Sequence, residues 1–263
     1  MRLDQWLSEL PAVRSRSHAR DLILNLKILV NGKAAQKPSM EIREGDNVEI
    51  LGSDLSLFVS RGGAKLNRAM EHLGVNAENL VCLDVGSSTG GFSDCLLRSG
   101  ARFVVGIEVG TDQAHELLRK NSKFVVLEKT DIRKVNVQEI LKLAGSDGFD
   151  FIVGDVSFIS VTETFEVLSQ LIRPNGRLLV LVKPQFEVER QQLNKKGIVK
   201  DPSVYASVKE KIQASLFEHG FDVIEYFDSE LEGKDGNKEF FAFASPSGTH
   251  SELRNSENQT HGT

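Results

Sequence analysis

The chain has 263 residues, of which 40% are hydrophobic and 26% charged, and its formal net charge is −5. This length suits one large domain or one large and one small domain, and the composition is ordinary for a soluble globular protein. No apolar run reaches the roughly 18 residues that a membrane-spanning helix needs, and the opening MRLDQWLSEL is charged where a signal peptide has an apolar core. We therefore expect a cytoplasmic protein, monomeric in solution, with no membrane partner.

The cysteines and histidines predict no metal site. Cys82 and Cys95 lie in apolar segments, and buried, reduced thiols there are typical of a reducing compartment. The six histidines do not cluster with cysteines or carboxylates at the spacing of metal ligands.

Residues 1 to about 50 predict a small α+β module. Apolar residues at helical spacing in RLDQWLSEL and SRSHARDLILN predict two short helices, with Leu3, Trp6 and Leu7 in the core. ILVNGK predicts a strand that runs into an Asn-Gly hairpin turn. REGDNVEI predicts a last strand after a Gly-Asp pair.

The net charge conceals an asymmetry within this module. Residues 1–40 hold seven Lys/Arg and three acids, a balance of +4, whereas residues 41–54 hold one Arg and five acids, a balance of −4. A basic face on an acidic protein can hold a polyanion. Arginine forks suit phosphate groups and helix starts suit anions, although a merely solvated basic face has the same composition.

The order RLD, SR before the second helix, VNG in the turn and GD before the last strand resembles the S4 RNA-binding domain. The S4 family usually has glycine after the second helix, where this chain has Asn25-Leu26-Lys27. Asn also adopts the left-handed conformation of a helix C-cap, so the assignment is kept. The resemblance implies RNA phosphate contacts by Arg2, Arg14, Arg16, Arg20, Lys33 and Lys37.

From about residue 80 the pattern changes to strands that alternate with helices. That alternation predicts an α/β fold with a mainly parallel sheet covered on both faces. A helix over residues 61–73 should precede the sheet, and the last two strands, which have no helix between them, should form an antiparallel edge. The seven predicted strands are 81–85, 102–108, 124–128, 150–155, 177–182, 221–227 and 239–244.

The loop in CLDVGSSTGGFSD, residues 82–94, joins the first of these strands to its helix. Glycines here let the backbone approach a ligand at a helix N-terminus. A dinucleotide fingerprint that starts at Gly86 fails at Ser88, and no Gly-Lys-Ser/Thr follows to make a Walker loop. The remaining pattern, D-x-G-x-x-x-G-G with Asp84 at its head, resembles the S-adenosylmethionine loop of Rossmann-like methyltransferases.

The resemblance implies S-adenosylmethionine as the cofactor. We expect Gly86→Val to block its binding and to leave the fold intact. Glu108 and Asp131, at the ends of the second and third strands, should bind the ribose hydroxyls and the adenine amino group, since such sheets bind ligands at this edge. Each acid alone resembles an ordinary surface residue. The implied cofactor contacts are Asp84, Gly86, Ser87, Ser88, Thr89, Gly90, Gly91, Phe92, Glu108, Asp131 and Asp155.

An unusual lysine ends the strand in GRLLVLVKPQFE, residues 176–187. Lys183 should face the same crevice as Asp155 in GDVSF, Glu239 in GNKEFF and Lys65 in SRGGAKL. Together they resemble the K-D-K-E tetrad of FtsJ-type RNA ribose 2′-O-methyltransferases. A set of buried ion pairs without catalytic function is the alternative.

Longer matches follow this tetrad. SRGGAKL, DVGSSTGGFSDCLL, DVSFIS, LVKPQFE, KKGIVKDP and GNKEF, behind an S4 domain, resemble the haemolysin-A (TlyA) family of ribosomal RNA methyltransferases almost throughout the chain. Glu108, in IEVG, departs from the DVG usual in that family, which keeps the carboxylate on a longer stem. The resemblance implies a Rossmann-like class I methyltransferase with a seven-stranded, mainly parallel sheet, preceded by an S4 domain.

The implied reaction is methyl transfer to a ribose 2′-hydroxyl, by resemblance that of cytidine, in ribosomal RNA or a ribosomal subunit. The hydroxyl is a very weak acid, and an amine serves as its base only when burial or a nearby cation lowers the amine's pKa. Lys183 is therefore assigned as base or as oxyanion stabiliser, oriented by the acids, with no metal. The domains should be 1–59 (S4-like domain and linker), 60–245 (FtsJ-like methyltransferase) and 246–263 (a disordered tail).

Two other functions are compatible with parts of the pattern. One is a non-catalytic RNA-binding or ribosome-assembly protein with a vestigial methyltransferase fold. The other is a haemolysin, as the family's name suggests, although no signal peptide, membrane-spanning run or strongly amphipathic basic helix supports it.

Overall fold

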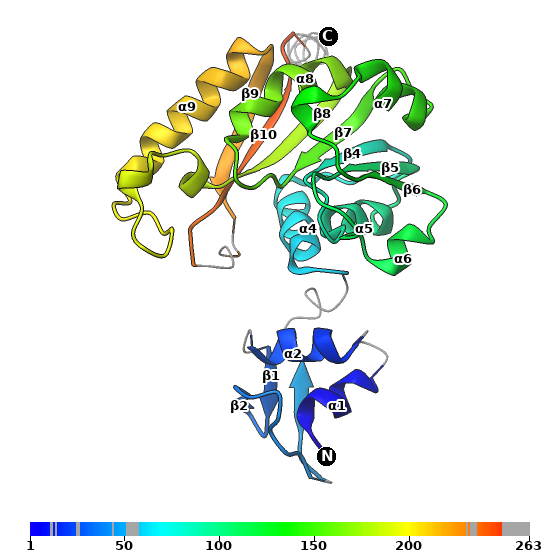
Figure 1. The fold of residues 1–263 in the computed structure, drawn as a ribbon, viewed down its shortest axis with the longest axis vertical. Coiled ribbons are helices and arrows are strands. Elements are labelled where there is room, and N and C mark those ends of the chain that lie inside the picture. The colour runs from blue at the N-terminus through cyan, green and yellow to red at the C-terminus, as the bar shows by residue number, and fades with distance from the viewer. Residues whose placement is uncertain are drawn as a thin grey trace, which may run out of the picture. The chain divides into compact units, whose positions relative to one another are not determined.

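The computed structural model describes residues 1–10, 13, 15–24, 27–43, 45–50, 58–229, 231 and 236–248 (Figure 1). The chain divides into two compact units, Met1–Ala64 and Lys65–Thr263. Some sequence predictions lie outside the described residues: those for Arg14, for Asn25 and Leu26, for most of the linker and for the tail from residue 249 onward.

The first unit has the α+β elements that its sequence predicts. Helices α1 (Leu3–Ser8) and α2 (Arg16–Leu24) precede strands β1 (Ile28–Val30), β2 (Lys33–Ala34) and β3 (Val48–Ile50). The three strands form an antiparallel sheet in the order β2-β1-β3. The β1–β2 turn has positive φ at Asn31 (52°) and Gly32 (75°), as an Asn-Gly hairpin turn requires. Leu3, Leu7 and Ile23 are fully buried in the core of this unit.

The second unit alternates strands with helices, and the sequence prediction of an α/β fold is confirmed (Figure 1). The helix α4 (Arg61–Leu73), which contains the division between the units, has the predicted bounds. The strands are β4 (Val81–Val85), β5 (Phe103–Ile107), β6 (Phe124–Leu127), β7 (Phe149–Gly154), β8 (Ile172–Val182), β9 (Phe221–Asp228) and β10 (Phe240–Pro246). The helices between them are α5 (Gly91–Arg98), α6 (Glu116–Arg119), α7 (Val137–Ala144), α8 (Phe165–Leu171) and α9 (Val204–Glu218), with short 3-10 turns η1 (Ile132–Lys134), η2 (Val161–Thr164), η3 (Pro184–Phe186) and η4 (Arg190–Gln192).

The seven-stranded sheet has the order β6-β5-β4-β7-β8-β10-β9. Strands β4 to β8 pair in parallel, and β10 is antiparallel to both of its neighbours. The last two strands therefore pair as predicted, but only β9 is the edge strand, because β10 inserts between β8 and β9. This insertion places Phe240 opposite Val182, so the residues just outside the pair, Glu239 and Lys183, arrive at the same end of the sheet.

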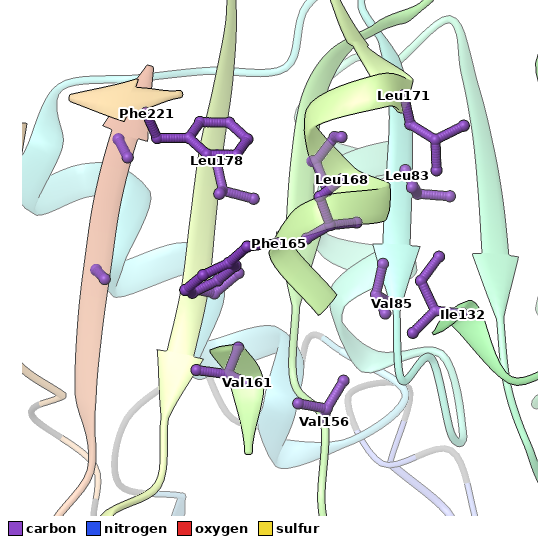
Figure 2. Packing of buried hydrophobic residues seen from close by; sticks show 14 of the residues in the cluster. Leu83, Val85, Ile132, Val156, Val161, Phe165, Leu168, Leu171, Leu178 and Phe221 are labelled. Atoms are coloured by element: carbon purple, nitrogen blue, oxygen red, sulfur yellow. The ribbon is translucent and has the colours of Figure 1, made fainter. Parts of the chain in front are cut away.

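One face of the sheet carries a large apolar core beneath α7, α8 and α9. Figure 2 shows Phe165 and Leu168 of α8 directed toward the sheet, among Leu178 of β8 and Leu83 of β4. Phe165 is fully buried, and burial of such a side chain contributes about 1.5–3 kcal/mol. Val156 and Val161 belong to the same core. These two side chains therefore fix the loop that follows β7 to the apolar core.

Within the described residues, no helix is both long enough and apolar enough to cross a membrane.

Candidate active site

The glycine-rich loop after β4 packs against the loop after β7. Gly86 has φ +79°, and a Cβ at this position would lie 2.7 Å from the backbone oxygen of Asp155. The amide of Gly86 donates to the carbonyl of Ile107 on β5, and the amide of Asp155 donates to the carbonyl of Val85 on β4. Glycine is thus needed at position 86, where the ends of β4, β5 and β7 meet. The expectation that Gly86→Val leaves the fold intact is wrong, since the new side chain would strike the backbone of Asp155.

Asp84 is fully buried on β4 and organises the start of α5. Its Oδ2 accepts hydrogen bonds from the amide (2.9 Å) and the hydroxyl (2.6 Å) of Ser93. Burial raises the pKa of its carboxyl to about 7, although the hydrogen bonds of Ser93 oppose the shift. Its Oδ1 has no donor in hydrogen-bond geometry among the described residues, although the Ser87 hydroxyl also opposes the shift of the pKa. A buried acceptor without a donor is costly, so this oxygen suits a donor that the chain itself does not supply.

Glu108 follows β5 and binds the glycine-rich loop. Its carboxylate accepts from the amides of Ser88 and Gly110, each at 2.7 Å, and from Nε2 of Gln113 at 3.4 Å. The side chain is buried. Since a carboxylate has about four acceptor positions, Glu108 retains capacity for a ligand while it fixes the shape of the loop.

Asp131 follows β6 and caps η1. Its oxygens accept from Nε (2.9 Å) and Nη2 (2.8 Å) of Arg133, whose hydrogen bonds hold the pKa of this carboxyl below its usual range. Nη1 of Arg133 in turn donates to Glu163 at 2.5 Å. Both oxygens of Asp131 are therefore already engaged, so a contact with an adenine amino group would have to use their remaining lone pairs.

Lys183 ends β8 and forms an ion pair with the residue that ends β7. Its Nζ lies 2.7 Å from Oδ1 of Asp155 and donates to Oγ of Ser157 at 2.7 Å. The Lys183 side chain is 12% exposed and that of Asp155 is 27% exposed. The pair is thus accessible to a substrate at this edge.

Lys65 and Glu239 form the second ion pair of the predicted tetrad. Lys65 lies on α4, and Glu239 immediately precedes β10. Both side chains are largely buried. The four predicted residues therefore form two lysine–carboxylate pairs, and the β8–β10 register brings Glu239 and Lys183 to the same end of adjacent strands.

In the first unit, Arg2, Arg16 and Arg20 line one pocket together with the buried Asp4. Arg2 donates to both oxygens of Asp4 at 2.9 and 3.0 Å, and Arg16 reaches the same carboxylate at 3.2 Å. These arginines hold the pKa of Asp4 well below its usual range. Lys33 and Lys37 are exposed but do not line this pocket. The sequence did not single out Asp4, which orients two of the predicted phosphate contacts.

The comparisons with known proteins agree with this architecture. A family model described as FtsJ-like methyltransferase matches residues 58–245, and one described as S4 domain matches residues 1–48. "Hemolysin A" of Brachyspira hyodysenteriae is 34% identical over 242 residues, which cover 92% of this chain and 98% of that protein.

The chain belongs to the haemolysin-A (TlyA) family.

A relative in Mycobacterium tuberculosis named 16S/23S rRNA (cytidine-2′-O)-methyltransferase TlyA is 33% identical and covers 91% of this chain and 88% of that protein. A solved structure from Streptococcus thermophilus, assigned as a hemolysin, is 30% identical with a TM-score of 0.72 and covers 98% of both chains. A methyltransferase structure from Listeria monocytogenes, 15% identical with a TM-score of 0.52, covers 71% of this chain and 99% of that chain and shows the same fold. Membership of this family implies S-adenosylmethionine as the methyl donor.

Three features at the carboxyl edge of this TlyA-family sheet were missed by sequence reasoning. Ser157 binds Lys183, and its only signal in the sequence is its place two residues after Asp155. Phe158 is 88% exposed with φ +68°, and its ring lies 5.4 Å from that of Phe186. The Glu187 side chain, by contrast, is only 1% exposed. No periodicity marks these residues, because their roles depend on loops that are distant in sequence.

Proposed function

We propose that this protein transfers a methyl group from S-adenosylmethionine to a ribose 2′-hydroxyl of ribosomal RNA, with cytidine as the nucleotide. The observation that carries the proposal is the pair of lysines at one edge of the sheet, Lys183 paired with Asp155 and Lys65 paired with Glu239. The names of the relatives in M. tuberculosis and Campylobacter jejuni, both cytidine-2′-O-methyltransferases, support the choice of nucleotide.

The residues at this edge fit the proposed methyl donor. S-adenosylmethionine carries an ammonium group and two ribose hydroxyls, all of which are hydrogen-bond donors. The edge offers matching acceptors, the Oδ1 of Asp84 that has no donor among the described residues and the carboxylate of Glu108. The glycine-rich loop keeps Ser88 and Thr89 exposed beside Glu108, which supports a role for Ser87 to Phe92 in holding the ligand.

Bound S-adenosylmethionine would supply an electrophilic methyl group on sulfur. Asp155 and Ser157 fix the Nζ of Lys183 from two sides. An ammonium has three N–H donors, so one remains for the acceptor oxygen of the substrate. As an ammonium, Lys183 stabilises the developing charge on that oxygen through this N–H. As a base, it must instead be a neutral amine whose lone pair accepts the proton of the 2′-hydroxyl. Alignment of oxygen, methyl and sulfur contributes about 7–11 kcal/mol of the lowering of the barrier.

RNA as the substrate has support from both units. The arginine pocket of the first unit presents guanidinium groups oriented by Asp4, which suits phosphate. In the second unit, Phe158 is exposed on the loop that also carries Asp155. Phe158 has a left-handed backbone, with φ +68°. This conformation costs on the order of 1–3 kcal/mol at a non-glycine residue, and residues that adopt it cluster at functional sites. An exposed aromatic ring there offers a nucleobase a surface for stacking.

The test is methyl transfer from labelled S-adenosylmethionine to purified small and large ribosomal subunits from a strain that lacks the enzyme. Mapping of 2′-O-methyl positions with and without the protein identifies the nucleotide and the subunit. A cytidine that gains a 2′-O-methyl group only in the presence of the protein is the expected result. RNA binding without methyl transfer at any nucleotide would contradict the proposal and indicate an assembly factor. Lysis of erythrocytes by the purified protein would indicate a direct haemolytic activity.

A further inference from the structure

Glu187 lies four positions after Lys183, at the end of the short turn that Lys183 begins. The carbonyl of Lys183 accepts from the amide of Phe186 at 2.9 Å, and that of Pro184 accepts from the amide of Glu187 at 3.0 Å. Pro184 restricts the backbone at the start of this turn. The positions of Lys183 and Glu187 are therefore rigidly related.

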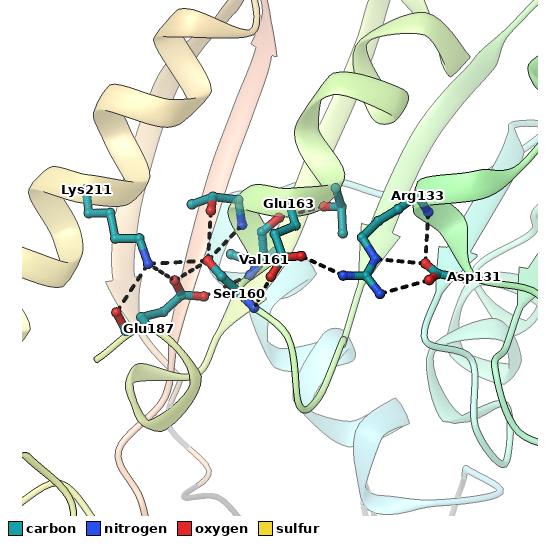
Figure 3. Close-up of polar contacts among 9 residues, drawn as sticks. Asp131, Arg133, Ser160, Val161, Glu163, Glu187 and Lys211 are labelled. Carbon is teal, nitrogen blue, oxygen red and sulfur yellow. Dashed lines mark hydrogen bonds and ion pairs between the residues drawn. The ribbon is translucent and has the colours of Figure 1, made fainter. Parts of the chain in front are cut away.

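The carboxylate of Glu187 is buried and fully engaged (Figure 3). Its Oε1 accepts from the amide of Val161 at 2.8 Å, and its Oε2 accepts from Oγ of Ser160 at 2.5 Å. Nζ of Lys211 on α9 approaches Oε2 at 2.8 Å. A buried carboxylate is costly unless donors surround it, and here all three donors come from outside its own loop.

Two of these donors belong to the loop that carries the other half of the ion pair. Asp155 and Ser157 hold Lys183 near the start of that loop, and Ser160 and Val161 hold Glu187 near its end. The segment from Lys183 to Glu187, which follows β8, is therefore bound at both of its ends to the loop after β7. A shift of either loop would break contacts of Glu187 and of Lys183 together.

The contacts continue toward the loop after β6 (Figure 3). The amide of Ser160 donates to Glu163 at 3.3 Å, and Glu163 accepts from Arg133, which holds Asp131. Glu187 therefore lies within a polar chain that links three of the loops at the carboxyl edge of the sheet.

We propose that Glu187 is a positioning residue for methyl transfer, which holds the Lys183 loop against the Asp155 loop so that Nζ of Lys183 stays aligned with the acceptor oxygen. The inference rests on the proposed function. The side chain of Glu187 is only 1% exposed and its oxygens are engaged by Ser160, Val161 and Lys211. Its loss should therefore change the rate of the chemical step and leave binding unchanged.

The decisive variant is Glu187→Gln, which keeps the size of the side chain. Val161 and Lys211 can only donate hydrogen bonds, whereas one end of a glutamine amide is itself a donor. If the NH2 group takes the place of Oε1, it faces the N–H of Val161, and if it takes the place of Oε2, it faces the ammonium of Lys211. Two donors therefore face each other in either orientation. Because a displacement of about 1 Å can lower a rate by about 10²-fold, the single-turnover rate should fall by about 10- to 100-fold. The affinities for S-adenosylmethionine and for RNA should stay within about twofold.

Glu166→Gln is the matched control, because Glu166 is exposed on α8 and undergoes the same chemical change; its rate should equal that of the wild type. Because the charged Lys211 favours the oxygen end of the glutamine amide, the NH2 end should face the Val161 N–H. Hydrogen exchange at the Val161 amide therefore provides a readout that does not depend on activity, and protection there should fall in Glu187→Gln only. If Glu187→Gln folds poorly, Lys211→Met removes one donor from the surface side, and a smaller loss of rate with unchanged affinities is expected.

A wild-type rate in Glu187→Gln, with lost protection at Val161, would overturn the positioning role. So would a loss confined to the affinity for RNA. A wild-type protein that transfers no methyl group to ribosomal RNA would overturn the proposed function instead. The exchange measurement alone would then decide whether Glu187 joins the two loops.

Discussion

Lys183 Nζ lies 2.7 Å from Oδ1 of Asp155, although the two residues end different strands of the sheet. Parallel strands deliver their carboxyl ends to one edge, so a lysine after β8 and an aspartate after β7 meet there although they are 28 positions apart in the sequence. Ser157 occupies a second N–H of the same ammonium. The pair and its hydroxyl partner form a fixed cation at the edge where we propose that the methyl donor binds.

Lys183→Ala should lower the single-turnover rate of methyl transfer to the background level, while the affinities for S-adenosylmethionine and RNA change little. The amine acts on the reacting oxygen and holds neither partner. Lys183→Arg should fail as well, because an arginine does not release its proton in proteins and its planar fork cannot reproduce both short contacts. Lys195→Ala, at an exposed lysine outside the site, is the control.

The two substitutions separate the two roles of Lys183. Substantial activity in Lys183→Arg would assign it as an electrostatic stabiliser. Near wild-type rates in Lys183→Ala would show that Lys183 is a structural partner of Asp155 and has no catalytic role.

Gly86→Ala should destabilise the protein and reduce cofactor affinity. The added Cβ would lie 2.7 Å from the Asp155 backbone oxygen. Alanine is also strained at the positive φ of this position. Gly145 is a matched control, since its φ is +58° and a Cβ added there would meet nothing within 4 Å. Gly145→Ala should cost about 1 kcal/mol for the left-handed backbone, and Gly86→Ala should cost at least about 1–3 kcal/mol more because of overpacking. Equal denaturant midpoints for the two variants would contradict the close contact.

The sequence predicts the strands of the large sheet and the end of the sheet that holds the candidate site. Lys183 and Asp155 could be assigned to one edge because each ends a buried apolar strand. Whether Lys183 pairs with Asp155 or with Glu239 could not be predicted, because both carboxylates arrive at that edge. The pairing depends on side-chain directions that only the packed loops determine.

Other parts of the site depend on contacts between distant segments. Gly86 meets the Asp155 backbone 69 positions later, so a ligand-binding glycine and a packing glycine have the same sequence pattern. The antiparallel pairing of the last two strands was predicted, but the position of β10 between β8 and β9 depends on tertiary pairing that no local propensity encodes. Asp131 is satisfied by Arg133, two residues away, yet the reach of that arginine to Glu163 again depends on the fold.

Stability should depend on pH through Asp84. The pKa of this carboxyl is raised to about 7 in the folded protein, against about 3.9 for an unperturbed aspartate. Between about pH 4 and pH 7 the folded state therefore binds the extra proton, and the free energy of unfolding falls as the pH rises, by at most about 1.4 kcal/mol per pH unit. The contribution is fully present below about pH 4 and is lost above about pH 7.

Asp84→Asn should remove that slope, because asparagine stays neutral and its amide oxygen still accepts from Ser93. Urea unfolding at several pH values between 5 and 8 measures the effect in both proteins. Identical slopes in the wild type and in Asp84→Asn would show that Asp84 titrates near its ordinary value.

RNA affinity should depend on the arginine pocket of the first unit. Arg20→Glu combined with Arg16→Gln should weaken RNA binding and reduce the salt slope by about one for each lost phosphate contact. Glutamine is chosen at position 16 because a carboxylate there would face Asp4, which Arg16 now contacts at 3.2 Å. Affinity for S-adenosylmethionine should not change.

Arg102→Glu is the control for this variant. Arg102 is exposed and precedes β5, at the amino edge of the parallel strands, the edge opposite the candidate site. Titration of a ribosomal RNA fragment at several salt concentrations measures both the affinity and the slope. The substitution at Arg102 changes the net charge of the protein but removes no predicted phosphate contact, so its slope should match that of the wild type. Wild-type affinity and slope in the Arg16/Arg20 variant would mean that the basic pocket is only solvated surface.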